Sequence, residues 1–254
     1  MTTDGLNLAG RTVFLTGASS GLGRHMALTL ARAGARMALA ARRADELEAV
    51  AREIEGFDGR ALPLVLDVRD ADAIEAAVEA AETELGPIHV LVNNAGMSIP
   101  KKPEDFTVED YDRIFGINLR GAWLLAQAVG RRMIAHGSGG KIINVSSLLA
   151  LKPISRLSLY AMTKAAMNQM TQQLALEWAR HDIQVNAICP GYIETEMNAA
   201  HWRSPAGQEL ISRMPRRRVG TPDALDGLML LLASDQGAFM TGSVIPIDDG
   251  QSLM

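Results

Sequence analysis

Tyr160 and Lys164 stand four positions apart in the stretch YAMTK, and their types and spacing suggest chemistry more directly than any other pair in this chain. The stretch lies in a segment of helical pattern, so both side chains share one helix face. A phenol, with an ordinary pKa of about 10, is a poor base near neutrality, but a nearby cation stabilises the phenolate and lowers that pKa. Alone, a helical tyrosine is usually a packing residue and a lysine a solvated one. With suitable partners, the pair would be an acid/base and its tuner.

The elements that must position this pair follow an alternating pattern along the chain. Short apolar runs predict strands near residues 12–16, 36–41, 61–66, 89–92, 141–145, 184–188 and 243–247. Segments of helical period predict helices near residues 21–33, 44–54, 71–85, 108–135, 157–180 and 223–232. Strands this apolar are expected where helices cover both faces of a parallel sheet. The pattern predicts one α/β domain over residues 1–254, with a doubly wound, parallel, seven-stranded sheet.

Ligands of such a sheet bind beyond the carboxyl ends of its strands, where this sequence places glycines, amides and hydroxyls. The runs are TGASSGLG after the first strand, NNAG after the fourth, SS after the fifth and PG after the sixth. The first run opens a helix, and Gly17, Gly21 and Gly23 would let the backbone approach a pyrophosphate at the helix N-terminus, as in a Rossmann site. A tight strand-to-helix turn would explain these glycines about as well. Residues 190–218 break the alternation and are predicted to be an insertion that covers the site.

Composition and charge exclude several classes of protein. The net charge of −4 gives no basic footprint for nucleic acid. No apolar stretch approaches membrane-spanning length and residues 1–11 lack the features of a signal peptide, so a cytoplasmic protein without membrane contact is expected. Cys189, the single cysteine, is expected to be a buried thiol. The five histidines lack metal-ligand spacing, so no metal site is expected.

The ordered motifs resemble those of the classical short-chain dehydrogenases/reductases, from about residue 8 to the C-terminus. TGASSGLG, NNAG, INLRGAW, INVSS, YAMTK and PGYIETEM occur in that family's order. The resemblance implies hydride transfer between a nicotinamide and a carbonyl, with Tyr160 as acid/base and Lys164 as its tuner and a ribose contact. Ser147, with Ser146 as a structural neighbour, would hydrogen-bond the substrate oxygen. Asn118 would keep a water in line with Lys164 for proton relay.

The same resemblance implies where the coenzyme binds. Its contacts would be Gly17, Ser19, Ser20, Gly21, Leu22, Gly23, Arg42, Arg43, Asp67, Val68, Asn94, Ala95, Gly96, Tyr160, Lys164, Pro190, Gly191, Ile193 and Thr195. Thr195 would contact the carboxamide of the nicotinamide, and Ile193 would add backbone contacts to it. Asp67, with Val68 beside it, would accept a hydrogen bond from the adenine amino group.

The end of the second strand, MALAARR, predicts which coenzyme is used. Sites that prefer NAD place an acidic residue about 20 positions beyond the glycine loop, where it accepts from the ribose 2′-hydroxyl and repels a 2′-phosphate. Ala41 stands there and can do neither. Arg42 and Arg43 can instead meet a phosphate with charge-assisted hydrogen bonds, although Arg43 could also simply begin a solvated helix. NADP(H) is therefore predicted to be preferred over NAD(H).

The expected function is oxidation of a secondary alcohol or reduction of a ketone, with a small-molecule substrate. A reductase of 3-oxoacyl thioesters on an acyl carrier protein is an alternative. Ser138 and His181 weaken it, because they stand where such relatives carry basic residues. A catalytically idle nucleotide sensor is a second alternative, but a sensor would not need the four catalytic residues together.

Substrate specificity is expected to depend on three segments, residues 97–103, 148–157 and 192–218. Met97, Met162 and Met197 are predicted to give an adaptable apolar pocket. The arginine run 216–218 is most simply a solvated edge, with contact to an anionic substrate as the alternative.

A homotetramer is predicted, because the segments 108–135 and 157–180 are apolar on both faces and need more than one sheet to cover them. The C-terminal stretch GSVIPIDDGQSLM would join a second interface. It carries Asp248, Asp249 and Gly250 where relatives often have one acid followed by two glycines, so the turn there is expected to differ.

Overall fold

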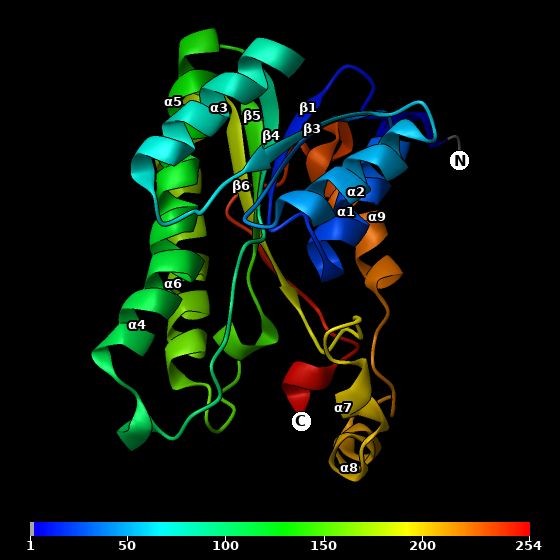
Figure 1. Cartoon of the computed structure of the whole chain (residues 1–254), viewed down its shortest axis with the longest axis vertical. Coiled ribbons are helices and arrows are strands. Elements are labelled where there is room, and N and C mark those ends of the chain that lie inside the picture. Colours follow the sequence, from blue (N-terminus) through cyan, green and yellow to red (C-terminus); the bar gives the residue numbers. More distant parts are fainter. Residues whose placement is uncertain (1–2) are drawn as a thin grey trace.

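The computed structural model describes residues 3–254, and within them the frame is one seven-stranded parallel sheet (Figure 1). The strands are β1 (Thr12–Thr16), β2 (Arg36–Ala41), β3 (Arg60–Val65), β4 (Ile88–Asn93), β5 (Gly140–Val145), β6 (Ile183–Pro190) and β7 (Val244–Ile247). Their order is β3-β2-β1-β4-β5-β6-β7, so the direction of winding reverses between β1 and β4. Such a reversal leaves a crevice beyond the carboxyl ends of the strands. The predicted fold class is confirmed.

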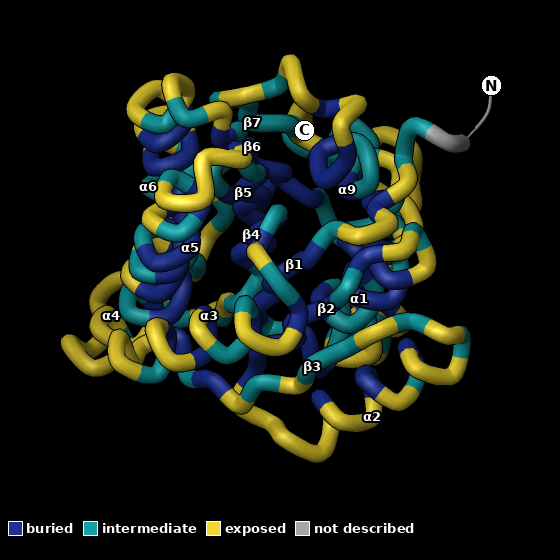
Figure 2. The backbone as a smooth tube through the Cα atoms, turned by 90° about the horizontal axis from the view of Figure 1, so that it is seen from above, coloured by how far each residue is buried: buried dark blue, intermediate teal, exposed yellow. Residues whose placement is uncertain are grey.

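Helices cover both faces of the sheet. On one face lie α1 (Gly21–Arg32), α2 (Ala44–Glu55) and α9 (Asp226–Ala233), and on the other α3 (Ala71–Leu85), α5 (Ala122–His136) and α6 (Ser158–Trp178). Each central strand divides its side chains between two cores: in β1, Val13 and Leu15 join the first and Phe14 the second. This alternation is the two-residue period of a strand. Figure 2 shows the buried strands enclosed by these helices.

The segment predicted as one helix, residues 108–135, is helical throughout, but it contains a π-helical turn that the sequence did not predict. α4 (Val108–Phe115) and α5 flank a π-helical segment, Gly116–Gly121. Such segments insert a residue into the helical hydrogen-bond ladder and are frequent at functional sites. The apolar spacing continues across the segment, so periodicity does not reveal it. A methyl group on Gly121 would lie 2.7 Å from the Val68 carbonyl oxygen, so only glycine allows this close approach.

Coverage of the sheet is incomplete at its edge. In β3, exposed and partly buried side chains alternate, and Val65 is 66% exposed. This strand pairs only with β2, so helices cover less of it than of the central strands, and the prediction of two covered faces fails there. The predicted helix 223–232 also begins differently, because a 3-10 turn, Pro222–Leu225, leads into α9.

The segment 190–218 leaves the sheet after β6 and forms two short helices, α7 (Ala199–Arg203) and α8 (Pro205–Arg213). Figure 1 shows them beyond the carboxyl ends of the strands, near the C-terminus. A bridge between Ile193 and Gly220 closes the segment where it returns. The segment therefore lies at the end of the sheet where ligands of this fold bind.

The C-terminal turn holds the far end of this segment through a charged cluster. Asp249 has a φ of 54°, in the left-handed region that favours glycine. Its carboxylate accepts hydrogen bonds from Arg218 Nε at 2.7 Å and Arg216 Nη1 at 2.8 Å. These bonds lower the pKa of Asp249 and raise the pKa of Arg218. Two members of the arginine run are thus structural partners of Asp249, which removes support for their contact with an anionic substrate.

Gln251 is buried behind that turn and joins both ends of the segment to it. Its side-chain oxygen accepts a hydrogen bond from the Tyr192 N–H at 2.7 Å. Its amide nitrogen lies 3.7 Å from Met214 Sδ and 3.5 Å from the Arg218 carbonyl oxygen. One side chain therefore fixes where the segment leaves the sheet and where it returns.

Candidate active site

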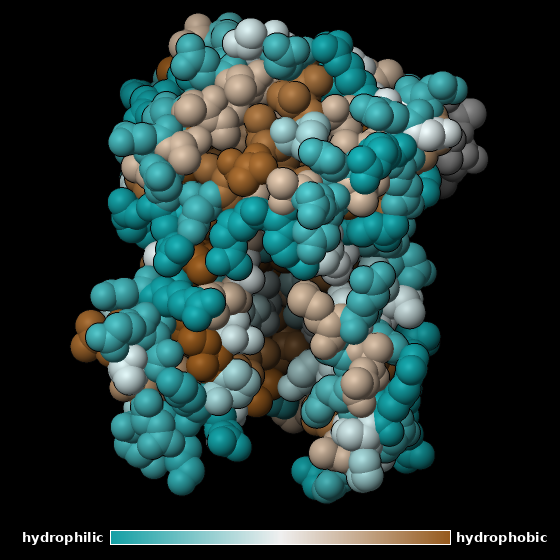
Figure 3. Space-filling view, viewed as in Figure 1, coloured by the Kyte–Doolittle hydropathy of each residue, from teal (hydrophilic) through white to brown (hydrophobic). Residues whose placement is uncertain are grey.

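A cleft of about 890 Å³ opens at the carboxyl ends of the strands. Figure 3 shows a hollow between the part of the molecule that carries α4 and the part that carries α7 and α8. The candidate site residues that line the cleft are Gly17, Ser19, Ser20, Leu22, Gly23, Arg42, Arg43, Asp67, Val68, Asn94, Ala95, Gly96, Ser147, Tyr160, Lys164, Pro190, Gly191, Ile193 and Thr195. Gly21 and Asn118 are outside this lining. Residues far apart in the sequence thus converge on one cavity.

The glycine run forms a bend at the end of β1. Gly17 has a φ of 68° and Gly21 a φ of 53°, conformations that glycine adopts with little strain. A methyl group on Gly23 would lie 2.0 Å from the Gly17 carbonyl oxygen and 2.6 Å from the Asn94 amide nitrogen, so a larger residue would open the bend. α1 begins at Gly21, and the N–H groups of a first helical turn suit an anion. The bend is therefore a cradle that fits a pyrophosphate.

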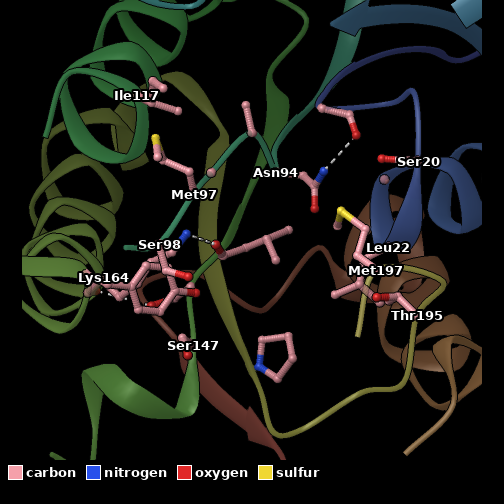
Figure 4. Close-up of a pocket in the computed structure, with 18 of the residues that line it drawn as sticks. Ser20, Leu22, Asn94, Met97, Ser98, Ile117, Ser147, Lys164, Thr195 and Met197 are labelled. Carbon is pink, nitrogen blue, oxygen red and sulfur yellow. Dashed lines mark hydrogen bonds between the residues drawn. The ribbon is translucent and has the colours of Figure 1, made fainter. Parts of the chain in front are cut away.

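Asn94 holds this bend against the end of β4. Its Nδ2 donates to the Thr16 carbonyl oxygen at 2.9 Å, and its N–H donates to the Thr16 hydroxyl at 3.0 Å. The Ala95 N–H donates to the same hydroxyl at 3.0 Å. Figure 4 shows Asn94 between the two sides of the cleft, with Leu22 and Thr195 on one side and Ser147 and Lys164 on the other.

Lys164 is buried at the base of the second side. Its residue surface is 3% exposed, and Nζ donates to the Val145 carbonyl oxygen at 2.7 Å. Nζ lies 5.7 Å from the centre of the Tyr160 ring, so the pair is close together, as the spacing predicts. Loss of water around the ammonium lowers the pKa of Lys164 to about 8. The lysine can therefore give up a proton near neutral pH.

Burial has the opposite effect on Tyr160. Desolvation of the phenolate raises the pKa of Tyr160 above its ordinary value of 10.0, while the neighbouring Ser147 hydroxyl acts to lower it. Lys164, whose ammonium donates to Val145, is not among the groups that shift this pKa in the chain by itself, so its role as tuner stays a prediction. At neutral pH Tyr160 is a protonated phenol, the form that can give a proton to an alkoxide.

Ser146 and Ser147 follow β5 and have different surroundings. Ser146 Oγ donates to the Lys164 carbonyl oxygen at 3.2 Å, which ties the strand to α6. Both serines line the cleft, and Ser147 Oγ accepts from the Leu149 N–H at 3.1 Å. The Ser147 hydroxyl also bonds the Tyr160 side chain, so it lies beside the phenol and could share its proton with a substrate oxygen. The division of roles between the two serines stays a prediction.

Asn118, on the π-helical segment, is fully buried and firmly bonded. Its Oδ1 accepts from the Met97 N–H at 2.8 Å, and its Nδ2 donates to the Met97 carbonyl oxygen at 2.9 Å and to the Thr163 hydroxyl at 3.1 Å. Thr163 donates in turn to the Tyr160 carbonyl oxygen at 2.7 Å. Both amide protons are in use, so Asn118 connects the loop after β4 to the turn of α6 that carries Tyr160. It can hold a water only through the second lone pair of Oδ1.

Arg42 and Arg43 follow Ala41, the last residue of β2, and differ in their contacts. Arg43 turns back over the glycine run, and its Nη2 donates to Ser19 Oγ at 2.9 Å and to Ser20 Oγ at 2.6 Å. Arg43 also stands at the N-cap of α2 and pairs with Glu46 at 3.1 Å, so it both begins that helix and contacts the glycine run. Arg42 is exposed on the lining and makes no hydrogen bond or ion pair with any residue from 3 to 254. One guanidinium is held at the loop, and the other is available beside it.

Asp67 is engaged by Arg69, a residue that the sequence analysis did not consider. Arg69 Nη2 donates to Asp67 Oδ2 at 2.6 Å, and Nε lies 3.1 Å from each carboxylate oxygen. These bonds lower the pKa of Asp67, with a smaller contribution from the charge of Arg42. The carboxylate thus pairs with a cation of its own chain and keeps lone pairs on the cleft lining, so the expected adenine contact stays a prediction. The DVR spacing is the signal that would have indicated this pair.

The cleft also has a largely apolar part, for which the sequence predicted three segments and three methionines. Its lining residues are Met97, Ser98, Leu148, Leu149, Leu157, Tyr192, Met197 and Asn198. Met97 and Met197 thus line the cleft as predicted. Met162 does not: it is 52% exposed, since two positions along a helix from Tyr160 the side chain faces another direction.

Among residues 3–254, no helix is both long and apolar enough to cross a bilayer. Over the same range, His, Cys, Asp and Glu side chains nowhere gather in threes as a metal site would require. Cys189 is fully buried, which confirms that prediction.

Comparison with known proteins identifies relatives over nearly the whole chain. A family model described as enoyl-(acyl carrier protein) reductase matches residues 17–252. D-erythrulose reductase of Gallus gallus is 37% identical over 246 residues, 96% of this chain and 97% of that protein. The NAD-dependent glycerol dehydrogenase of Listeria innocua is 35% identical over 247 residues, 97% of this chain and 96% of that protein. The crystal structure of a gluconate 5-dehydrogenase from Burkholderia cenocepacia, in complex with NADP and tartrate, matches with a TM-score of 0.93 and 35% identity, covering 99% of this chain and 98% of that one.

The chain therefore belongs to the short-chain dehydrogenase/reductase family, as its motifs indicated. It is an oxidoreductase of the kind that acts on alcohol and ketone groups. These relatives differ in their coenzymes and in the charge of the molecules for which they are named.

Titration of the free protein tests the sign of the pKa shift at Tyr160. The chain has three tyrosines, and the ultraviolet difference between the wild type and Tyr160→Phe isolates this one. We expect the phenol to ionise above its ordinary pKa of 10.0, because the cleft desolvates the phenolate. Added NADP⁺ should lower the pKa, since an oxidised nicotinamide brings a positive charge. A Tyr160 pKa below 10.0 in the free protein would contradict this account.

Proposed function

We propose that this enzyme uses NADP(H) to transfer a hydride between the nicotinamide and a small secondary alcohol or ketone, with Tyr160 as the acid/base. One observation carries the proposal: Tyr160, Ser147 and Lys164 meet in one part of a cleft whose other part ends in the glycine run and Arg42. The relatives named for erythrulose and glycerol support a small hydroxylated substrate.

The cleft fits a nicotinamide dinucleotide. Gly17 and Gly23 have no room for a Cβ, which keeps the bend tight, and a pyrophosphate would lie against this bend at the N-terminus of α1. Ile193 and Thr195 line the wall formed after β6, where they would contact the carboxamide. When bound, the coenzyme supplies or accepts the hydride.

In ketone reduction, the task of the side chains is to bind the carbonyl and to deliver a proton. The Ser147 hydroxyl donates a hydrogen bond to the carbonyl oxygen, and Tyr160 Oη gives its proton to that oxygen as the hydride reaches the carbon. The raised pKa of Tyr160 keeps this proton on the phenol at neutral pH. Lys164 stands beside the phenolate as it forms. Alcohol oxidation needs the phenolate, so it should gain as the pH rises.

Reprotonation of Tyr160 would pass through Lys164. A methyl group on Gly96 would lie 3.6 Å from both Asn118 Oδ1 and Lys164 Nζ, so these two atoms border one small gap. A water in that gap could accept from the ammonium and donate to the free lone pair of Oδ1. In this proposal Asn118 takes part in the relay as an acceptor.

Replacement of Tyr160 by Phe tests the function. The variant keeps the ring and loses the transferable proton, so we expect kcat for NADPH-dependent ketone reduction to fall by about 10²- to 10⁴-fold. NADPH binding, followed by coenzyme fluorescence, should persist. Tyr111→Phe removes a hydroxyl from an exposed tyrosine and is the matched control. Near-native turnover of Tyr160→Phe across a panel of ketones would refute the mechanism.

The preference for NADP(H) is proposed from the end of β2. Ala41 offers no acid to a ribose 2′-hydroxyl, and Arg42 is unpaired within residues 3–254. Arg43 is held over Ser19 and Ser20 on the same rim. A 2′-phosphate there would meet two guanidinium groups. The relatives include an NAD-dependent enzyme and one solved with NADP, so they do not decide between the two coenzymes. The proposed preference therefore rests on Ala41, Arg42 and Arg43.

We predict that kcat/KM favours NADPH over NADH by at least about tenfold, because a hydrogen bond to a charged group contributes about 1.5–3 kcal/mol. The double variant Ala41→Asp with Arg42→Ala should reverse the preference, since it adds repulsion of the 2′-phosphate. Arg42→Ala alone is the matched control and should only weaken the preference. Equal or better kinetics with NADH in the unmodified enzyme would remove the coenzyme assignment and leave the oxidoreductase function intact.

The two alternative functions are less well supported. An acyl carrier protein would be met by basic residues, but Ser138 and His181 stand at the expected positions, and the relatives above are named for small alcohols and ketoses. A nucleotide sensor would not need Ser147, Tyr160 and Lys164 gathered in one cleft.

The assembly proposed is a homotetramer. The large apolar side chains exposed on α4, α5 and α6 are Val108, Tyr111, Trp123, Met162 and Leu176. Phe239 and Leu253, which precede and follow β7, are also exposed. Two apolar faces suit an assembly with two kinds of interface. Sedimentation velocity at micromolar concentration should show four copies, and a monomer would contradict the proposal.

A cytoplasmic location stays a prediction.

A further inference from the structure

The charged side chains of the cleft lie away from the reacting groups or are already engaged. Among the described residues that line it, those with charge are Arg42, Arg43, Asp67 and Lys164. The first three follow β2 and β3, whereas the reacting groups follow β5. The ammonium of Lys164 is buried and donates to Val145. The substrate part of the cleft is thus left without a free cation in residues 3–254.

Several cations in the segments around that part have partners elsewhere. Lys101 donates to Asp110 at 2.5 Å, Lys152 donates to the carbonyl oxygen of Met254, and Arg216 and Arg218 bind Asp249. Recruiting one of these for a ligand would break a bond that stabilises the fold. Lys102 and Arg156 have no side-chain partner within residues 3–254, but neither belongs to the cleft lining.

The lining beside the phenol is uncharged. Leu148, Leu149 and Leu157 give apolar surface, and the hydroxyls of Ser98 and Tyr192 have no hydrogen-bond partner within residues 3–254. A carboxylate placed there would lose its water without gaining a cation, which is an unfavourable way to bury a charge. Substrate hydroxyls could pair with Ser98 and Tyr192.

The geometry points to an uncharged substrate, a ketone or secondary alcohol that carries further hydroxyls but no carboxylate. The inference rests on the proposed function and adds the charge of the substrate to it. It aligns this enzyme with relatives named for erythrulose and glycerol, and separates it from those named for gluconate.

Matched pairs of ketones test the inference. L-sorbose and 5-keto-D-gluconate differ only in whether the terminal carbon is an alcohol or a carboxylate, and 2-pentanone and levulinate differ only in a methyl or a carboxylate. With NADPH and the unmodified enzyme, we expect the neutral member of each pair to have the higher kcat/KM by at least about tenfold. The reason is that the carboxylate of the acid must lose its hydration in the cleft without gaining a cationic partner.

A cation introduced into the lining should reverse this selection. Leu157 is half-buried on the cleft, at the start of α6, so Leu157→Arg can reach a carboxylate from there. We expect the ratio of kcat/KM for acid over neutral ketone to rise by at least about tenfold. Leu157→Gln, polar but uncharged, is the matched control and should leave that ratio near the wild-type value. Coenzyme binding confirms that both variants are folded.

The outcomes separate this inference from the proposed function. An acid that equals or exceeds its neutral partner in the unmodified enzyme overturns the inference alone. A ratio that rises equally in Leu157→Arg and Leu157→Gln also overturns it, since charge would then have no part. Enzyme that binds NADPH and turns over no ketone of either kind overturns the proposed function, and the inference with it.

Discussion

The buried ammonium of Lys164 is the interaction on which the rest of the site depends. A charge that has lost its water needs a partner, and the carbonyl oxygen of Val145 supplies one at 2.7 Å. That oxygen is in place because β5 ends there. The Ser146 hydroxyl donates to the Lys164 carbonyl oxygen at 3.2 Å, so the end of β5 both accepts a hydrogen bond from this turn of α6 and donates one to it. A slip of one residue between β5 and α6 would leave a charge unpaired, which strongly disfavours every other register.

The contact between β5 and α6 continues into the core through a series of hydrogen-bonded polar side chains. Asn93 donates to Asn144 at 2.9 Å and Asn144 donates to Thr171 at 2.8 Å, all three buried. Buried amides and hydroxyls must be paired, so this chain specifies one stacking of β4, β5 and α6 where leucines alone would allow several. Asn118 and Thr163 make a second such link from the π-helical segment. Catalytic geometry is therefore a property of the core and not only of the cleft surface.

The features that depend on local pattern were predictable from the sequence, and those that depend on distant partners were not. Strand runs, the glycine bend and the spacing of Tyr160 and Lys164 follow from neighbouring residues. The bonds of Arg43 to the glycine run and of Asn118 to Met97 join residues 21–24 positions apart, and no periodicity encodes them. The pKa of Tyr160 depends on burial, which a spacing argument omits. The exposure of β3 follows from its place at the edge, which only the sheet order reveals.

Gln251 stands 59 positions after Tyr192, the residue whose backbone it holds. A ribosome releases a chain from its N-terminus onward, so the glycine run, β1 to β6 and α6 all emerge before this anchor does. The wall that carries Tyr192, Ile193 and Thr195 is therefore synthesised well before the side chain that anchors it. Its contribution to both the coenzyme site and the substrate site depends on the turn after β7.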